Sequence, residues 1–174
     1  MRKILLPALL LFCVSGLFAQ NYPVIMNNGT ILVNTGVGLG SLRAEQLPSL
    51  PLQCPLLLAS FDAAIPIAGL PLTIGLITGY FSEAASDSEE RYDYWSIAGR
   101  IAYHLAFNVP RLDTYILLTL GAAIAYHQDG NKHGIPWIGV GAGGRYFFHP
   151  NIGAFLELGL DAVQCVSLGV SFKI

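Results

Sequence analysis

Seven ionisable side chains of this 174-residue chain stand alone among apolar and glycine neighbours, which makes them the first candidates for chemistry. They share one parity of alternating segments, opposite to the aliphatic residues, and are Asp62, Arg100, His104, Arg145, Glu157, Asp161 and Lys173. Because successive strand side chains point to opposite faces, these residues should share an enclosed face. Enclosed charges of opposite sign are expected to pair. We predict a network around Arg100, Arg145 and Glu157 that rigidifies the interior; the alternative is a gate that exchanges partners to admit water or ions.

Catalysis is not predicted from the histidines. Nucleophilic catalysis requires a hydroxyl or thiol beside a base that an acid orients. His127 and Asp129, at the outer end of their segment, have no serine two residues away. His104 is expected near the periplasmic end of its segment. His133 and His149 are expected in a loop and a turn. We therefore predict no enzymatic activity and no catalytic residue.

Metal and cofactor sites are not predicted either. After the first twenty residues only Cys54 and Cys165 remain, and neither has the neighbours of a zinc site. The glycine runs at 36–40 and 139–144 have spacing like that of a phosphate-binding loop, but no helix follows either run. We expect no metal and no cofactor.

The elements that must position these residues alternate with a period of two. In the stretch Ile138–Asp161, one parity is aliphatic, and the other is mostly glycine with isolated charges of both signs. This pattern is typical of a strand that faces lipid on one side and a narrow, packed lumen on the other.

Turn signals divide the chain into eight such segments. They are 30–40, 55–65, 72–81, 94–107, 114–127, 136–148, 152–162 and 166–174. Short connections alternate with longer ones, as in outer-membrane barrels, whose periplasmic turns are short. The prediction is an all-β fold, an eight-stranded antiparallel transmembrane up-and-down β-barrel over residues 30–174.

Composition agrees with a membrane protein. Charged residues are 11% and apolar residues 53% of the chain, and the mean hydropathy is +0.56. Soluble domains carry about 25% charged residues. The best apolar run, Tyr115–Tyr126, is much shorter than the ~20 residues of a spanning helix, which leaves a closed barrel as the way to span a bilayer.

The first residues predict export. Arg2 and Lys3 precede an apolar run from Ile4 to Val14, and a cleavage site follows near Ala19, so residues 1–19 are predicted to be a cleaved signal peptide and 20–29 an N-terminal periplasmic segment. Removing two of nine basic residues leaves seven against eleven acidic ones, a net charge of −4. This charge argues against nucleic acid as a partner.

Two stretches resemble a known family. The run GVGAGGRYFFHPNIGAFLELGLD is similar to the penultimate hairpin of small bacterial outer-membrane barrels of the OmpA, OmpX and OmpW type. The final VSLGVSFKI resembles the C-terminal strand that the barrel assembly machinery reads, with Ile174 in place of the usual aromatic residue; its candidate signal residues are Val166, Leu168, Val170, Phe172 and Ile174.

The resemblance implies an integral protein of the bacterial outer membrane. Its partners would be outer-membrane lipid, the barrel assembly machinery and periplasmic chaperones, and its role structural, surface-interacting with host or surface ligands, or a narrow pore. An alternative is an OmpW-like channel for small hydrophobic molecules, lined by Leu56, Leu58, Ile77 and Phe81. A lipid A-modifying barrel enzyme is the least favoured reading.

Two further expectations concern the rims. Aromatic residues gather near segment ends and predict two interfacial belts. The belt at the outer ends is Tyr80, Phe81, Tyr94, Trp95, Tyr126 and Trp137, and the belt at the inner, periplasmic ends is Phe107, Tyr115, Tyr146, Phe147, Phe148 and Phe172.

Cys54 and Cys165 should both face inward at the extracellular rim. Export favours a disulfide between them, but an expected backbone separation of about 9–10 Å opposes it, because a bridge needs roughly 7 Å. The pairing stays open.

Overall fold

The computed structural model describes residues 29–39, 56–67, 70–84, 91–107, 109–127, 132–160 and 166–174. The predicted signal peptide, most of the segment 20–29, and Cys54, Asp161 and Cys165 lie outside the described residues. No helix long and apolar enough to cross a membrane is found among the residues that are described.

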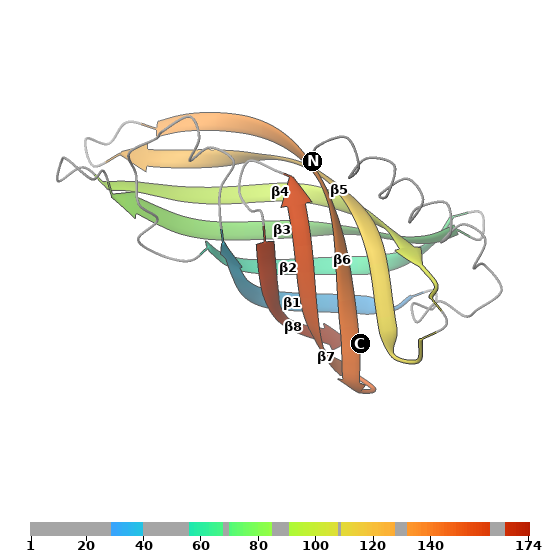
Figure 1. Ribbon diagram of the computed structural model, residues 1–174. Coiled ribbons are helices and arrows are strands. Elements are labelled where there is room, and N and C mark those ends of the chain that lie inside the picture. Colours follow the sequence, from blue (N-terminus) through green and yellow to red (C-terminus); the bar gives the residue numbers. More distant parts are fainter. Residues whose placement is uncertain are drawn as a thin grey trace, which may run out of the picture.

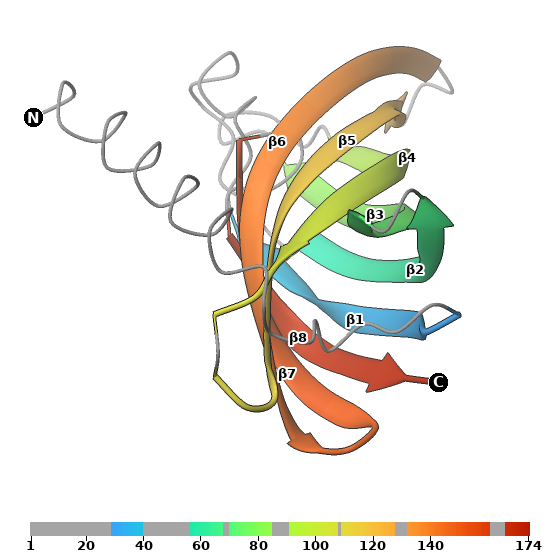
Figure 2. The same ribbon diagram turned by 90° about the vertical axis from the view of Figure 1, so that its right-hand side faces the viewer.

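Eight strands follow one another along the chain. They are β1 (Ile31–Leu39), β2 (Leu56–Ile67), β3 (Leu70–Ala84), β4 (Arg91–Leu105), β5 (Leu112–His127), β6 (Lys132–His149), β7 (Ile152–Leu160) and β8 (Val166–Lys173). Every strand pairs antiparallel with its sequence neighbours, and β1 also pairs with β8, so the sheet closes on itself. Figures 1 and 2 show the strands wrapped around a common axis, with β8 beside β1. The predicted eight-stranded antiparallel barrel is confirmed.

The barrel has two different ends. At one end, which we call the turn end, β1, β3, β5 and β7 begin and β2, β4, β6 and β8 finish. At the other, the loop end, β2, β4, β6 and β8 begin and β1, β3, β5 and β7 finish. At the turn between β4 and β5, Arg111 has a φ of 66°, which is uncommon for a residue other than glycine, and its carbonyl accepts a hydrogen bond from the Phe147 amide.

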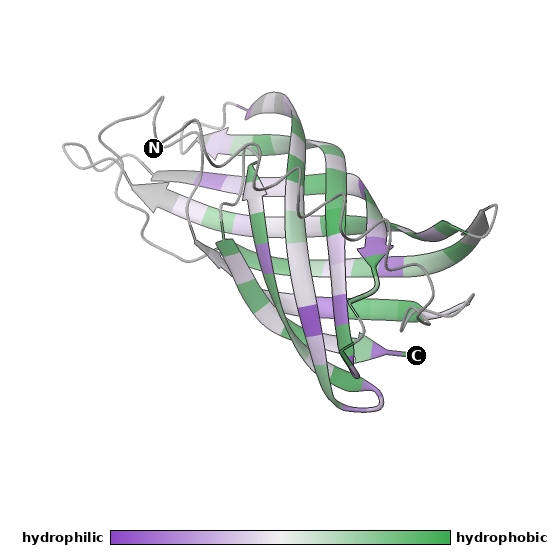
Figure 3. Cartoon of the chain, turned by 45° about the vertical axis from the view of Figure 1, so that its right-hand side comes forward, coloured by the Kyte–Doolittle hydropathy of each residue, from purple (hydrophilic) through white to green (hydrophobic). Residues whose placement is uncertain are grey.

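Alternating side chains give the wall two unlike surfaces. Along β4, Trp95, Ile97 and Ile101 are exposed on the outside, whereas Ala98 and Arg100 are buried inside. Colouring by hydropathy shows the same alternation along the strands (Figure 3). The strand pleat explains this difference, because residues two apart share a face.

The seam between β1 and β8 depends on glycine. Gly36 and Gly169 are direct partners across it, and a Cβ added to Gly169 would lie 2.5 Å from the Gly36 Cα and closer still to the Thr35 carbonyl oxygen. β1 and β8 can therefore approach this closely only because both residues are glycine.

Two expectations are corrected. Five of the residues assigned to the interfacial belts are buried inside the barrel instead: Phe81, Tyr94, Tyr115, Trp137 and Phe147. Each lies on the inward parity of its strand. That parity, rather than nearness to a strand end, decides whether the side chain faces the lumen or the membrane. His133, expected in a loop, lies within β6, which starts four residues before the predicted segment.

Candidate functional site in the barrel lumen

The lumen is filled in three layers. Toward the loop end lies an apolar layer, the loop-end cluster, made of Leu56, Leu58, Ile77, Phe81, Tyr94, Ala98, Ala123, Trp137 and Phe155. Next comes the charge network, made of Asp62, Arg100, His104, Asp113, Tyr115, Arg145 and Glu157. Leu32, Ala64 and Phe147 form a small apolar turn-end seal. An eight-stranded barrel is just wide enough for its side chains to fill.

Arg100 joins two carboxylates from opposite parts of the wall. Its Nη2 donates to Glu157 Oε1 at 2.7 Å, and its Nε lies 3.1 Å from Asp62 Oδ1. Tyr115 also donates to Glu157 Oε1, at 2.6 Å. These four side chains come from β4, β7, β2 and β5, so the contacts hold strands together that are not neighbours in the sheet.

Arg145 occupies the centre of the network and is 1% exposed. Its Nη1 donates to Asp113 Oδ2 at 3.0 Å, and its Nη2 donates to Asp62 Oδ2 at 3.4 Å and lies 4.0 Å from Glu157 Oε1. The guanidinium carbon is 4.1 Å from the centroid of the Tyr115 ring, a cation–π contact. Arg145 therefore has an anionic or aromatic partner on several sides, as a buried charge requires.

Neutral polar groups complete the network beside β1. Asn34 Nδ2 donates to Asp62 Oδ2 at 3.0 Å and to Ser60 Oγ at 2.8 Å. Its Oδ1 accepts a hydrogen bond of 2.6 Å from Ser171 Oγ. An amide is the side chain that can both donate to the carboxylate and accept from a hydroxyl, so Asn34 links the charge network to the β1–β8 seam.

A hydroxyl, an imidazole and a carboxylate line up at the turn-end side of the network. His104 Nδ1 lies 2.6 Å from Asp113 Oδ1, and its Nε2 lies 3.1 Å from Thr73 Oγ1. No such triad was predicted from the sequence. The order of groups resembles that of a hydrolase, but all three residues are 1–2% exposed. The contacts on its two ring nitrogens hold the His104 ring in one orientation between Asp113 and Thr73.

The predicted network residues separate into three groups. The structure brings together Asp62, Arg100, Arg145 and Glu157, with His104 joined to them through Asp113. Lys173 lies elsewhere: its Nζ is 4.9 Å from the centroid of the Phe147 ring at the turn-end seal. Asp161 is outside the described residues.

Two members of the network were missed from the sequence. Asp113 lies one residue before the predicted segment, and Tyr115 was assigned to an interfacial belt. Both share the parity of Leu117 and Thr119, which are also buried. Extending that parity from Leu117 four residues toward the turn would have identified both.

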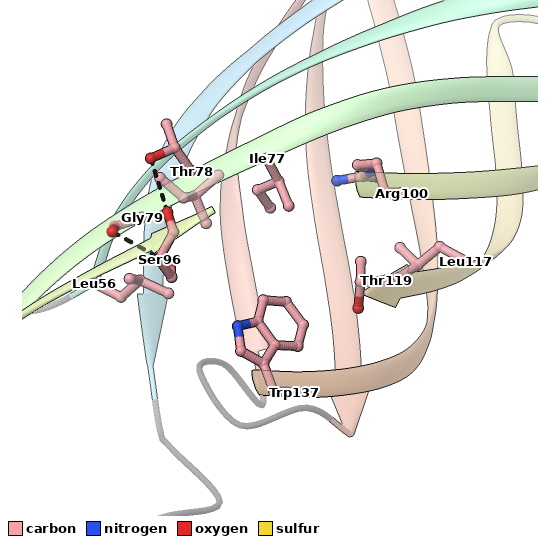
Figure 4. Close-up of a pocket in the computed structure, with 10 residues that line it drawn as sticks. Leu56, Ile77, Thr78, Gly79, Ser96, Arg100, Leu117, Thr119 and Trp137 are labelled. Carbon is pink, nitrogen blue, oxygen red and sulfur yellow. Dashed lines mark hydrogen bonds between the residues drawn. The ribbon is translucent and has the colours of Figure 1, made fainter. Parts of the chain in front are cut away.

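The four residues of the predicted apolar lining, Leu56, Leu58, Ile77 and Phe81, all belong to the loop-end cluster. The Phe81 ring stacks on Tyr94, with 4.6 Å between centroids and 5° between planes. A small cavity lies between this cluster and Arg100 (Figure 4). The volume that the centre of a water molecule can occupy in it is about 10 Å³. About one water molecule fills that space.

The barrel superimposes on the N-terminal β-barrel domain of Pseudomonas aeruginosa OprF with a TM-score of 0.57 and 14% identity, covering 86% of this chain and 100% of that one. Neisserial surface protein A gives 0.55 and 13% over 83% of this chain and 96% of that one, and Yersinia pestis outer membrane protein Ail gives 0.51 and 12% over 84% and 100%. The fold is that of the small outer-membrane barrels.

This resemblance is one of fold. No family model and no curated protein matches the sequence. The resemblance to small eight-stranded outer-membrane barrels inferred from the two motifs is confirmed at the level of architecture. Among the described residues, no group of three or more His, Cys, Asp or Glu side chains is placed to hold a metal ion.

Proposed function

We propose that this protein is an integral, non-enzymatic barrel of the bacterial outer membrane, with a sealed lumen and a structural or surface-interacting role. One observation carries the proposal: a lumen closed by buried ion pairs lies inside a wall whose outer surface is aliphatic. In water, such an outer surface would be a large exposed apolar patch. In a bilayer it is the expected lipid-facing band.

The height of the wall fits a membrane. On β4, the outward positions run from Asp93, which accepts a hydrogen bond from Tyr80 at 3.0 Å, to Tyr103. Trp95, Ile97 and Ile101 lie between them. Ten residues at about 3.3 Å, tilted by roughly 40°, span about 25 Å along the barrel axis. A hydrophobic band of this height is typical of outer-membrane barrels.

The proposed orientation puts the turn end in the periplasm and the loop end outside, as in other outer-membrane barrels. Along β8, Leu168, Val170 and Phe172 are exposed on the outer surface, where an assembly factor could contact them. Together with Val166 and Ile174, they form the proposed signal for the barrel assembly machinery. Periplasmic chaperones would hold the chain before assembly.

Conductance tests the sealed lumen. Reconstituted into a planar bilayer, the folded wild-type protein is expected to give no steady single-channel current, because the charge network and both apolar layers fill the lumen. A variant that removes one large buried side chain from each layer, Trp137→Ala, Arg100→Ser and Phe147→Ala, should conduct. The lipid-facing variant Ile97→Ala should stay silent. Steady ohmic current from the wild type would overturn the sealed-lumen proposal and favour a narrow pore.

Transport of small hydrophobic molecules is a second candidate, favoured by the apolar character of the loop-end cluster. The cluster is packed, so entry of such a molecule would require Trp137 or Phe81 to move. Binding of a fluorescent apolar probe, compared between the wild type and Leu58→Ala, tests this candidate. Saturable wild-type binding that weakens in the variant would support transport. Absent or non-saturable binding would leave the structural or surface-interacting role.

A further inference from the structure

The cavity between the loop-end cluster and Arg100 contains polar groups that lack partners. Its walls are mainly Leu56, Leu58, Ile77 and Leu117, with Ser96, Thr119 and Trp137 also lining it. Within the part of the chain that the structure describes, Trp137 Nε1 and Thr119 Oγ1 are buried without a hydrogen-bond partner. Trp137 is 8% and Thr119 2% exposed. An indole N–H can only donate, and a buried one left unpaired destabilises the fold.

Ser96 is a hydroxyl of the cavity wall on the side that the indole nitrogen faces. In Figure 4, the nitrogen of Trp137 lies on the edge of the ring toward Ser96 and Leu56, and Thr119 lies beyond the opposite edge. Ser96 Oγ donates to the Gly79 carbonyl at 3.3 Å, a long hydrogen bond. The serine oxygen keeps its lone pairs as acceptors.

We propose that this cavity is a binding site for one water molecule, which accepts a hydrogen bond from Trp137 Nε1 and donates one to Ser96 Oγ. The space of about 10 Å³ suits a single water and is too small for a larger solute. An ion is a poor fit, because Arg100 beside the cavity is already paired with Asp62 and Glu157. The walls are otherwise apolar, so water is the neutral hydrogen-bonding molecule that the site takes.

The bound water gives Trp137 a defined orientation across the lumen. Without it, the indole ring would be held only by packing within the apolar loop-end cluster. With it, the ring is tied to β4 through Ser96, while its backbone belongs to β6. The water thus stabilises the layer that separates the charge network from the loop end.

Indole NMR on the full-length folded protein in detergent tests the site. The sequence has two tryptophans, so Trp95→Phe leaves Trp137 as the single indole signal. In that background, the Trp137 indole proton is expected to show a direct cross-peak to a long-lived water. Adding Ser96→Ala should abolish this cross-peak. Ser60→Ala is the matched control, because Ser60 is also a buried lumen serine but does not line the cavity.

Each outcome decides the proposal. A cross-peak lost in Ser96→Ala and kept in Ser60→Ala supports the water site. An indole proton without a water cross-peak in the parent protein overturns it. A cross-peak that both variants keep, or that both lose, also overturns it. Heat-modifiable gel mobility of each variant establishes that the barrel has folded.

Discussion

The buried Glu157 carboxylate has three polar partners, which come from three different strands. Its Oε1 accepts hydrogen bonds from Arg100 at 2.7 Å and from Tyr115 at 2.6 Å, and Arg145 Nη2 lies 4.0 Å away. Buried charge pairs are costly to break, because the remaining partner keeps its charge without compensation. The charge network should therefore behave as one unit, with residue effects that do not add.

A double-mutant cycle checks that coupling. Glu157→Gln and Arg100→Gln should each lower the free energy of unfolding by about 3–5 kcal/mol, since each removes one partner of the buried Arg100–Glu157 ion pair. The double variant should lose less than the sum, with a coupling of about 1–3 kcal/mol. Urea unfolding in lipid vesicles, followed by fluorescence, measures all three. Strictly additive losses would show that the two side chains act independently.

Tyr115 offers a second test at this scale. Tyr115→Phe removes the hydroxyl that donates to Glu157 but keeps the ring under Arg145, so stability should fall by about 1–3 kcal/mol. Tyr146→Phe is the matched control, because Tyr146 lies on the outer surface and is 51% exposed. Its loss should stay within about 0.5 kcal/mol. Equal effects on unfolding would contradict the role given to the buried hydroxyl.

The alternation of side chains decided which lumen residues could be identified from the sequence. Arg100, Arg145 and Glu157 could be assigned to the lumen because each interrupts a run of alternating aliphatic and small residues. Asp113 could not be assigned in this way, because it borders a turn, where alternation stops. The pairing of Asp62 with both arginines depends on strand tilt across the barrel, which no single segment encodes.

Among the elements, β1 and β8 meet at a seam where two glycines are direct partners. Gly36 faces Gly169, and neither tolerates a Cβ without displacing the backbone of the opposite strand. Gly75 and Gly121 are equally crowded by a neighbouring strand, but each has a partner with a side chain, Asp62 and Ala98. Because β1 and β8 close the sheet, closure should be sensitive to single methyl groups at this seam.

Glycine-to-alanine variants measure this sensitivity. Gly169→Ala should prevent or weaken closure, so that the heat-modifiable band is reduced or lost. Gly99→Ala is the control, because the nearest atom to its added Cβ is the Leu120 carbonyl oxygen at 3.9 Å, and its folding should be unchanged. Gel mobility and circular dichroism report both. Normal folding of Gly169→Ala would show that the seam can open enough for a methyl group.

At the same scale, all eight strands were predicted, but several of their ends were not. β3, β4 and β6 are longer than expected, with β3 running to Ala84, β4 starting at Arg91 and β6 starting at Lys132. The polar residues at 82–93 were assigned to a loop. Polar residues are equally typical of strands that extend above a membrane, so polarity does not distinguish the two. Pairing between β3 and β4 continues through Ala84 and Arg91, which sequence polarity alone does not reveal.

For the whole molecule, the two tryptophans report on the two sides of the wall. Trp95 is 53% exposed on the outer surface, and Trp137 is 8% exposed inside. In vesicles of brominated lipid, the fluorescence of Trp137→Phe, which keeps Trp95, should be strongly quenched. The fluorescence of Trp95→Phe, which keeps Trp137, should be quenched far less. Equal quenching would contradict the proposal that lipid covers the outer surface.

The seam between β1 and β8 also bears on how the chain reaches its folded state. Asn34 and Ser171, which are bonded across it, are 137 residues apart in the sequence. Contacts between such distant residues form late and slowly, because a long loop must be closed before they contribute any stability. Neither the first strand nor the lumen that it helps to line can be completed until the eighth has been synthesised. During that interval the aliphatic faces of all the earlier strands are vulnerable to aggregation, so biogenesis of this barrel should be limited by the wait for its last strand.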